Sequence, residues 1–227
     1  MLLSHRHKFI FLKSTKTAGT SVEMLLEPLC LPPGTSLPDE ERAQQVSEFG
    51  IIGRRGGAKP QAESDTWFNH MSASAIKELV APEIWEAYVK ITIVRNPFSR
   101  VLSAFRFMNR LGGNADYRAF GDEVAAFDAW LKLGKIMGYK HIVTVNGVLV
   151  ADRVLRHERL NVDLAGLISD LKLPVNAADL PNAKKRPAAY AAPPVAAFYN
   201  DSRRDRVLTL EGWSFDAFGY SRDPEDA

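Results

Sequence analysis

Short apolar runs alternate with polar loops along most of the chain. Residues 8–12 and 91–94 are apolar runs bounded by polar residues, and they predict short buried strands. Each run is followed by polar residues and then by a helical pattern, at residues 19–26 and 96–109. Two strand–loop–helix units of this kind predict a parallel sheet whose ligands bind at the carboxyl ends of the strands.

Caps and turn residues mark the ends of other elements. Ser72 is the expected N-cap of one helix, and Asn96 with Pro97 begins another. Asn146-Gly147 predicts a hairpin over residues 143–150. Further helices are expected at residues 72–80, 82–89, 124–133, 163–171 and 202–209. Residues 31–66 are rich in Pro, Gly and charge, and we interpret them as a mostly irregular flap.

Composition narrows the class of protein. The chain has 227 residues, of which 46% are hydrophobic and 25% charged, which predicts one globular α/β domain over residues 1–227. A net charge of +2 argues against a nucleic-acid partner, which needs a broad basic surface. Cys30 is the only cysteine, so the chain cannot form an intramolecular disulfide or a multi-thiolate zinc site, and no metal is expected. No apolar stretch approaches the length of a membrane span, so we expect a cytoplasmic protein.

The first candidate site is the polar loop at residues 13–21, between the first strand and its helix. Gly19 lets the backbone approach a ligand closely, Thr20 and Ser21 add hydroxyl donors, and Lys16 adds a positive charge. Backbone N–H groups at a helix start bind anions. The lysine precedes the glycine, so this is not a Walker A loop. A capped helix start with a solvated lysine is the alternative.

The second candidate site follows the strand at 91–94 and covers residues 95–103. Arg95 leaves the strand end with a forked set of donors that suits phosphate. Ser103 lies two turns into the next helix, with Arg100 on roughly the same face. The alternatives are a surface salt bridge for Arg100 and a satisfied interior hydroxyl for Ser103.

Together, in this order, the two motifs resemble the nucleotide-binding motifs of sulfotransferases that use 3'-phosphoadenosine-5'-phosphosulfate (PAPS). Segments at 69–73, 152–160, 180–185 and 218–220 extend the resemblance to the carbohydrate-type, family 2-like branch, with its heparan 2-O-sulfotransferase-like and bacterial members. The resemblance implies a three-layer, P-loop-NTPase-like fold with a central parallel sheet flanked by helices. This chain departs from the family pattern at Thr15, where proline is usual, and at His157, in the middle of the Arg-Phe-Glu segment.

The resemblance also implies residue roles, with PAPS as sulfuryl donor and the desulfated nucleotide PAP as product. Arg95 and Ser103 would bind the 3'-phosphate, and Lys185 would close over the nucleotide from a C-terminal loop. The 5'-phosphosulfate would be bound by Lys13, Lys16, Thr17, Ala18, Gly19, Thr20 and Ser21.

Sulfuryl transfer needs stabilisation of the leaving phosphate and an acceptor for the hydroxyl proton. Lys16 suits the first role. His70 suits the second, because it immediately precedes a helix, matches the family's histidine segment and can be neutral at working pH. Glu23 and Glu158 are alternative bases. The acceptor hydroxyl is expected on a carbohydrate or glycoconjugate.

Two other functions fit parts of the pattern. A P-loop-type kinase for small molecules shares the strand–loop–helix logic, but the chain has no Walker A motif. A non-catalytic nucleotide- or glycan-binding protein of the same fold would bind PAP without turning over PAPS.

Overall fold

The computed structural model covers residues 1–227 and describes all of them except 36, 39–40, 57–65, 111–121, 137 and 182–192. The chain forms two compact units, each of which is described by itself. Unit 1 comprises Met1–Val94 and Tyr139–Lys185, and unit 2 comprises Arg95–Gly138 and Arg186–Ala227.

Unit 1 is built on a six-stranded mixed sheet with the strand order β3-β4-β1-β2-β5-β8. β2 and β5 are parallel, as are β5 and β8, whereas β1, β4 and β3 add on in antiparallel fashion. The strands are β1 (Leu2–Ser4), β2 (Phe9–Leu12), β3 (Gln45–Ser47), β4 (Gly50–Ile52), β5 (Val89–Val94) and β8 (Arg153–Arg156). A separate two-stranded hairpin pairs β6 (Thr144–Val145) with β7 (Val148–Leu149).

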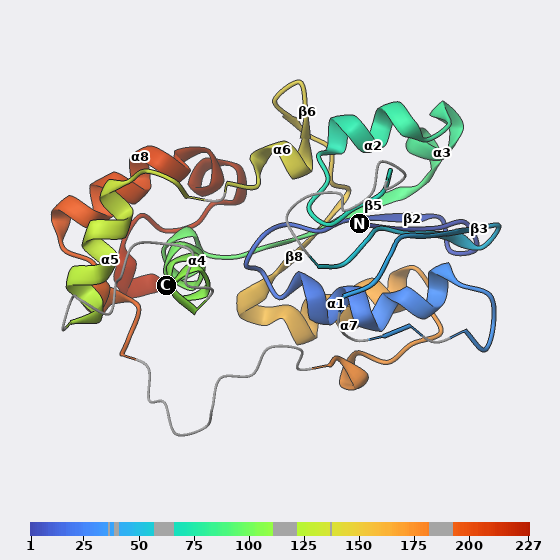
Figure 1. The fold of residues 1–227 in the computed structure, drawn as a ribbon, viewed down its shortest axis with the longest axis horizontal. Helices are drawn as coiled ribbons and strands as arrows, with labels where there is room; N and C mark the ends of the chain where they lie inside the picture. The colour runs from blue at the N-terminus through green and yellow to red at the C-terminus, as the bar shows by residue number, and fades with distance from the viewer. Residues whose placement is uncertain (36, 39–40, 57–65, 111–121, 137, 182–192) are drawn as a thin grey trace. The chain divides into compact units, whose positions relative to one another are not determined.

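Helices cover both faces of this sheet. In Figure 1, α1 (Gly19–Leu26) and α7 (Leu160–Asp170) lie below it, and α2 (Ala73–Leu79) and α3 (Pro82–Ala87) lie above it. The lower layer is a continuous apolar core, in which β2 and β5 side chains pack against both lower helices. The other helical segments of unit 1 are α6 (Lys140–Val143), η1 (Glu27–Cys30), η3 (His157–Arg159) and η4 (Ala177–Asp179).

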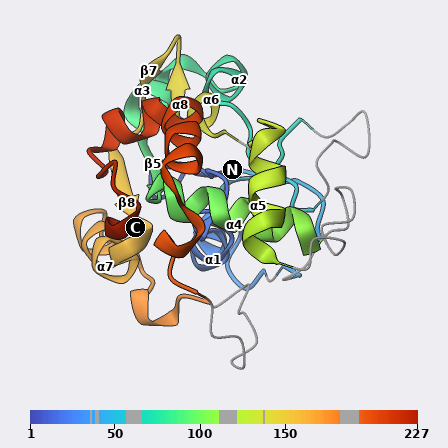
Figure 2. The same cartoon turned by 90° about the vertical axis from the view of Figure 1, so that its left-hand side faces the viewer.

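Unit 2 is helical in the part that the structure describes. Figure 2 shows its three main helices, α4 (Pro97–Arg110), α5 (Glu123–Lys132) and α8 (Asp201–Phe218). Their side chains pack in a shared core that is rich in aromatic rings. Phe98, Phe127 and Phe215 are among its buried rings. Its described residues also include two short helical segments, η5 (Ala196–Phe198) and η6 (Pro224–Asp226).

Most predicted elements are present, and their caps are where the sequence places them. Ser72 accepts a hydrogen bond from the Ala75 amide, and Asn96 accepts one from the Phe98 amide. The hairpin at 143–150 also forms, with Asn146 and Gly147 both at positive φ. α8 extends nine residues beyond the predicted end at 209, because the helix continues until Gly219 adopts the left-handed conformation.

The predicted parallel arrangement is confirmed for β2 and β5, and β8 adds a third parallel strand that the sequence does not predict; the other three strands are antiparallel, so the expectation of a parallel sheet is wrong for that half. Two of the antiparallel strands, β3 and β4, lie within residues 31–66, which the sequence predicts as mostly irregular. The mixed α/β class is therefore confirmed, while the P-loop-NTPase-like architecture stays a prediction. No helix among the described residues is apolar over a length that would cross a membrane.

Candidate active site

The predicted anion loop leaves β2 and enters α1 through an unusual backbone. Lys16 has φ 62° and Ala18 has φ 66°, a left-handed conformation that few residues other than glycine adopt. Ala18 is also the N-cap of α1, and an alanine has no side-chain acceptor. The first N–H groups of a helix have no partner within the helix, so this end of α1 offers donors and a positive dipole to an anion.

Buried hydroxyls support the loop from below. The Ser14 hydroxyl donates to the Ile93 carbonyl at the end of β5, and its oxygen lies 2.8 Å from that of Thr17. Both residues are buried. Thr17 is a predicted nucleotide ligand, but its hydroxyl is occupied within the loop, so only its backbone is placed to contact a ligand.

Gly19 is required by the protein's own packing. A Cβ at this position would lie 3.0 Å from Cγ of Lys13 and 3.4 Å from the carbonyl oxygen of Ser14. The missing side chain thus allows α1 to begin directly against the end of β2. The close approach of this backbone to a ligand stays a prediction.

The Lys13 side chain points into the protein. Its ammonium donates to Glu23 Oε2 at 2.6 Å and to Asn69 Oδ1 at 3.1 Å, and the residue is only 3% exposed. Lys13 is a predicted nucleotide ligand, yet the structure places its charge in a buried cluster beneath the loop. It supports the loop from that position.

Two arginines from the predicted flap complete this cluster. Arg55 donates to Glu23 Oε2 at 3.0 Å and also contacts Glu27, which Arg42 contacts as well. Counting Lys13, the cluster has three cationic and two carboxylate side chains. The amino group of Met1 lies 4.0 Å from Glu23 Oε1, but burial lowers its pKa to about 5, so at neutral pH the cluster leaves one positive charge beneath the anion loop.

Sequence reasoning missed the two arginines and misjudged Glu23. Glu23 was expected to be a solvated helix carboxylate or an alternative base, but it is fully buried. Burial alone would raise its pKa, but Lys13, the amino group of Met1 and Arg55 together outweigh burial and lower the pKa of Glu23 to about 2. A carboxylate this acidic is a poor proton acceptor. The spacing of Glu23 and Glu27, one turn apart among apolar residues, is the signal that buried cations were needed.

His70 contacts the loop directly. Its Nδ1 lies 2.9 Å from the Lys13 carbonyl oxygen. A carbonyl only accepts, so Nδ1 carries the proton and Nε2 is the basic nitrogen. Burial, followed by the nearby Lys13 ammonium, lowers the pKa of His70 to about 4. The ring is therefore neutral at physiological pH, in the tautomer that can take a proton at Nε2.

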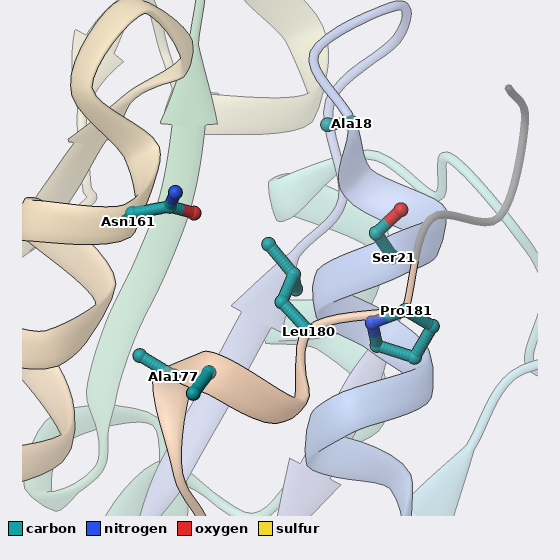
Figure 3. Close-up of a pocket in the computed structure, with 7 residues that line it drawn as sticks. Ala18, Ser21, Asn161, Ala177, Leu180 and Pro181 are labelled. Carbon is teal, nitrogen blue, oxygen red and sulfur yellow. The ribbon is translucent and has the colours of Figure 1, made fainter.

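A cavity of about 430 Å³ opens beside the start of α1 (Figure 3). Ala18 and Ser21 border it from α1, and Asn161 borders it from α7. Its remaining lining comes from Ala177, Ala178, Leu180 and Pro181. The cavity has the size of small-molecule sites, and the surface that lines it is more polar than apolar, although Ser21 and Asn161 are its only polar side chains among the described residues.

The second predicted motif lies in unit 2. The Arg95 guanidinium donates from Nε to the Ser99 hydroxyl at 2.9 Å. Ser103 is half-buried and follows Ser99 by one turn of α4, so the two hydroxyls share a helix face. Ser99 is a site candidate that the sequence reasoning missed. Arg100 instead is fully buried, 2.5 Å from Glu211 of α8, which makes it a core ion pair.

The comparison with family models decides the identity. Residues 1–143, well over half of the chain, match the sulfotransferase family. The chain belongs to the sulfotransferase family. The resemblance to family 2-like sulfotransferases is thereby confirmed. A comparison with curated proteins found no match, and one with solved structures found none either.

The matched region of this sulfotransferase contains the anion loop, His70 and the Arg95–Ser103 motif. Lys185 lies outside the described residues, so its predicted role stays a prediction. Glu158, the other alternative base, is exposed on η3. Among the residues that the structure describes, no three potential metal ligands cluster together.

The lowered pKa values predict how stability depends on pH. The His70 contribution is complete above its ordinary pKa of 6.5 and is lost as pH falls through about 4. The Glu23 contribution is complete above 4.5 and is lost as pH falls through about 2. Between pH 7 and 4.5, we expect His70 to account for a loss of about 2–3 kcal/mol in the free energy of unfolding.

Urea unfolding of the wild type and of His70→Asn, followed over that pH range, measures this contribution. Asparagine tolerates positive φ and does not titrate. His141→Asn, which changes an exposed histidine, is the matched control and should follow the wild type. Parallel curves for the wild type and His70→Asn would contradict the prediction.

Proposed function

We propose that this sulfotransferase transfers a sulfuryl group from PAPS to a hydroxyl of a carbohydrate or glycoconjugate acceptor. One observation carries the proposal: the uncapped start of α1, reached through left-handed Lys16 and Ala18, borders a cavity of ligand size. An anion at the loop and a nucleoside in the cavity would belong to one molecule.

The donor fits these features in two parts. The 5'-phosphosulfate would accept hydrogen bonds from the N–H groups of Ala18, Gly19 and Thr20, with the Lys16 ammonium as point charge. The adenosine would bind in the cavity, where Asn161 and Ser21 offer polar side chains in a lining that is more polar than apolar. The positive charge left over in the buried cluster adds to the attraction of the loop for the donor.

The sequence motif at 95–103 supplies the proposed site for the 3'-phosphate. Arg95 offers a forked donor set, and Ser103 offers a hydroxyl on the face of α4 that also carries Ser99. Lys185 is proposed to close over the nucleotide.

The reaction follows from these assignments. The acceptor oxygen attacks sulfur, and the bond between sulfur and the bridging oxygen of the 5'-phosphate breaks. Its electron pair leaves with PAP, whose new charge is stabilised by Lys16 and the loop N–H groups. The acceptor proton moves to Nε2 of His70. The products are PAP and the sulfate ester of the acceptor.

The carbohydrate acceptor, the P-loop-like fold and the cytoplasmic location rest on the sequence alone. The kinase and the non-catalytic binding protein differ from our proposal in measurable ways. Incubation with labelled PAPS and candidate acceptors, followed by mass analysis for an added sulfate, tests the overall reaction.

PAP should raise the melting temperature of the protein more than ATP does, because a ligand that binds the native state stabilises it.

Arg95→Ala and Ser103→Ala should each weaken the binding of PAP by about 1.5–3 kcal/mol and leave the binding of AMP nearly unaffected, since only PAP has the 3'-phosphate. Titration calorimetry with both nucleotides measures the difference. Arg106→Ala is the control, because Arg106 also lies on α4 but pairs with Glu123.

Equal losses for PAP and AMP would contradict the assignment of Arg95 and Ser103. Stabilisation by ATP without any effect of PAP would favour the kinase.

Lys16→Ala and His70→Asn should impair catalysis in different ways. Lys16→Ala should lose turnover and also bind PAP more weakly, because the Lys16 ammonium contacts phosphate in the ground state as well. His70→Asn should bind PAP normally while kcat falls roughly 10²–10⁴-fold, the range for a lost general base. The wild-type rate should persist below pH 6 and fall as pH drops through about 4, where His70 becomes protonated.

Steady-state kinetics between pH 4 and 8 with labelled donor tests both roles. A His70→Asn enzyme with normal kcat would remove His70 from the mechanism. A wild-type rate that already halves near pH 6.5 would show that the working base is a different group or a solvated histidine.

A further inference from the structure

Two consecutive residues, Asn69 and His70, are held by the two ends of one lysine. Asn69 Oδ1 accepts from the Lys13 ammonium at 3.1 Å, and His70 Nδ1 donates to the Lys13 carbonyl at 2.9 Å. The residues are more than fifty positions apart in sequence, so these contacts tie the start of the anion loop to the segment that precedes α2.

Lys13 itself has little freedom to move. Its ammonium is fixed by the fully buried Glu23, and its backbone continues directly from β2. Asn69 is also held through its backbone, because its N–H donates to the Arg54 carbonyl at 3.0 Å. Lys13 and Asn69 therefore form a rigid clamp around the histidine.

The backbone of His70 needs such a clamp. Its φ is 58°, which places the residue in the left-handed region. Histidine enters that region more readily than most residues, but the conformation persists only when its surroundings hold it. The hydrogen bond between Asn69 and the Lys13 ammonium fixes the residue immediately before His70. The hydrogen bond from Nδ1 to the Lys13 carbonyl fixes the His70 ring.

We propose that Asn69 is a positioning residue of the sulfuryl transfer, which holds His70 in its left-handed conformation with Nδ1 on the Lys13 carbonyl and Nε2 as the basic nitrogen. This inference rests on the proposed function, in which His70 takes the acceptor proton. Asn69 acts through His70 and needs no contact with either substrate.

The pKa of His70 reports whether the clamp holds the ring in place, because it depends on the charges near the ring. The Lys13 ammonium and the amino group of Met1 disfavour a charged ring, and the Glu23 carboxylate favours one. Release of the ring from Lys13 would expose it to water and move it away from the ammonium. Both changes raise the pKa of His70, and they outweigh the loss of the hydrogen bond to the Lys13 carbonyl, which alone would lower it.

Two substitutions separate positioning from general stability. Asn69→Ala removes the hydrogen bond to Lys13 but leaves the Lys13–Glu23 ion pair. Asn69→Asp keeps an acceptor for the ammonium while adding a negative charge beside the ring. Asn200→Ala, which removes the N-cap of α8 in unit 2, is the control for the loss of an asparagine hydrogen bond.

For Asn69→Ala, we expect PAP affinity within about twofold of the wild type and kcat lowered at least about tenfold, as for a misplaced catalytic group. For Asn69→Asp, kcat at neutral pH should stay within about threefold, because the same hydrogen bond remains. In both variants the nitrogen NMR signals of the His70 ring should titrate at higher pH than in the wild type. Asn200→Ala should change neither kcat nor the His70 titration.

Normal kcat and an unchanged His70 titration in Asn69→Ala would overturn the inference, as would equal losses of kcat in both Asn69 variants. If the Asn69 inference fails in this way but His70→Asn has lost turnover in the same assays, the proposed function still stands. Full turnover of His70→Asn would overturn the base role and this inference with it.

Discussion

The buried ion pair between Lys13 and Glu23 is the contact on which the rest of the site depends. Lys13 is the first residue after β2, and Glu23 lies one turn into α1, so their contact closes the loop between strand and helix. Two charges removed from water are stable only if their partners are complete. The remaining partners of this pair's cluster are Arg55, Arg42 and Glu27. The loop therefore rests on a rigid group of buried ion pairs.

A rigid base explains how the loop keeps an otherwise unfavourable backbone. Lys16 and Ala18 are left-handed without being glycine, and Ala18 provides no cap. These features leave the start of α1 without a side-chain cap, so its first N–H groups can donate to an anionic sulfuryl donor. The same Lys13 whose side chain anchors the loop accepts the His70 hydrogen bond. Lys13 thus positions both the loop proposed to stabilise the leaving group and the histidine proposed to accept the proton.

The sequence predicts the loop and the histidine but not what lies beneath them. Apolar runs, Asn96-Pro97 and Asn146-Gly147 predict their elements because local chemistry determines those elements. β8 escapes prediction because it has only two apolar residues between Arg153 and Arg156, although it pairs with β5. The burial of Lys13, Glu23 and Arg55 depends on contacts between distant segments. Residue type alone favours exposure for all three.

The central claim is that the backbone at the start of α1 binds the phosphate end of the nucleotide. The most direct measurement is a titration of labelled protein with PAP, followed through the backbone amide NMR signals. We predict the largest shifts at the N–H groups of Ala18, Gly19 and Thr20, with smaller shifts at Asn161 and Ala177 around the cavity. Saturation by PAP without shifts at these residues would contradict the account.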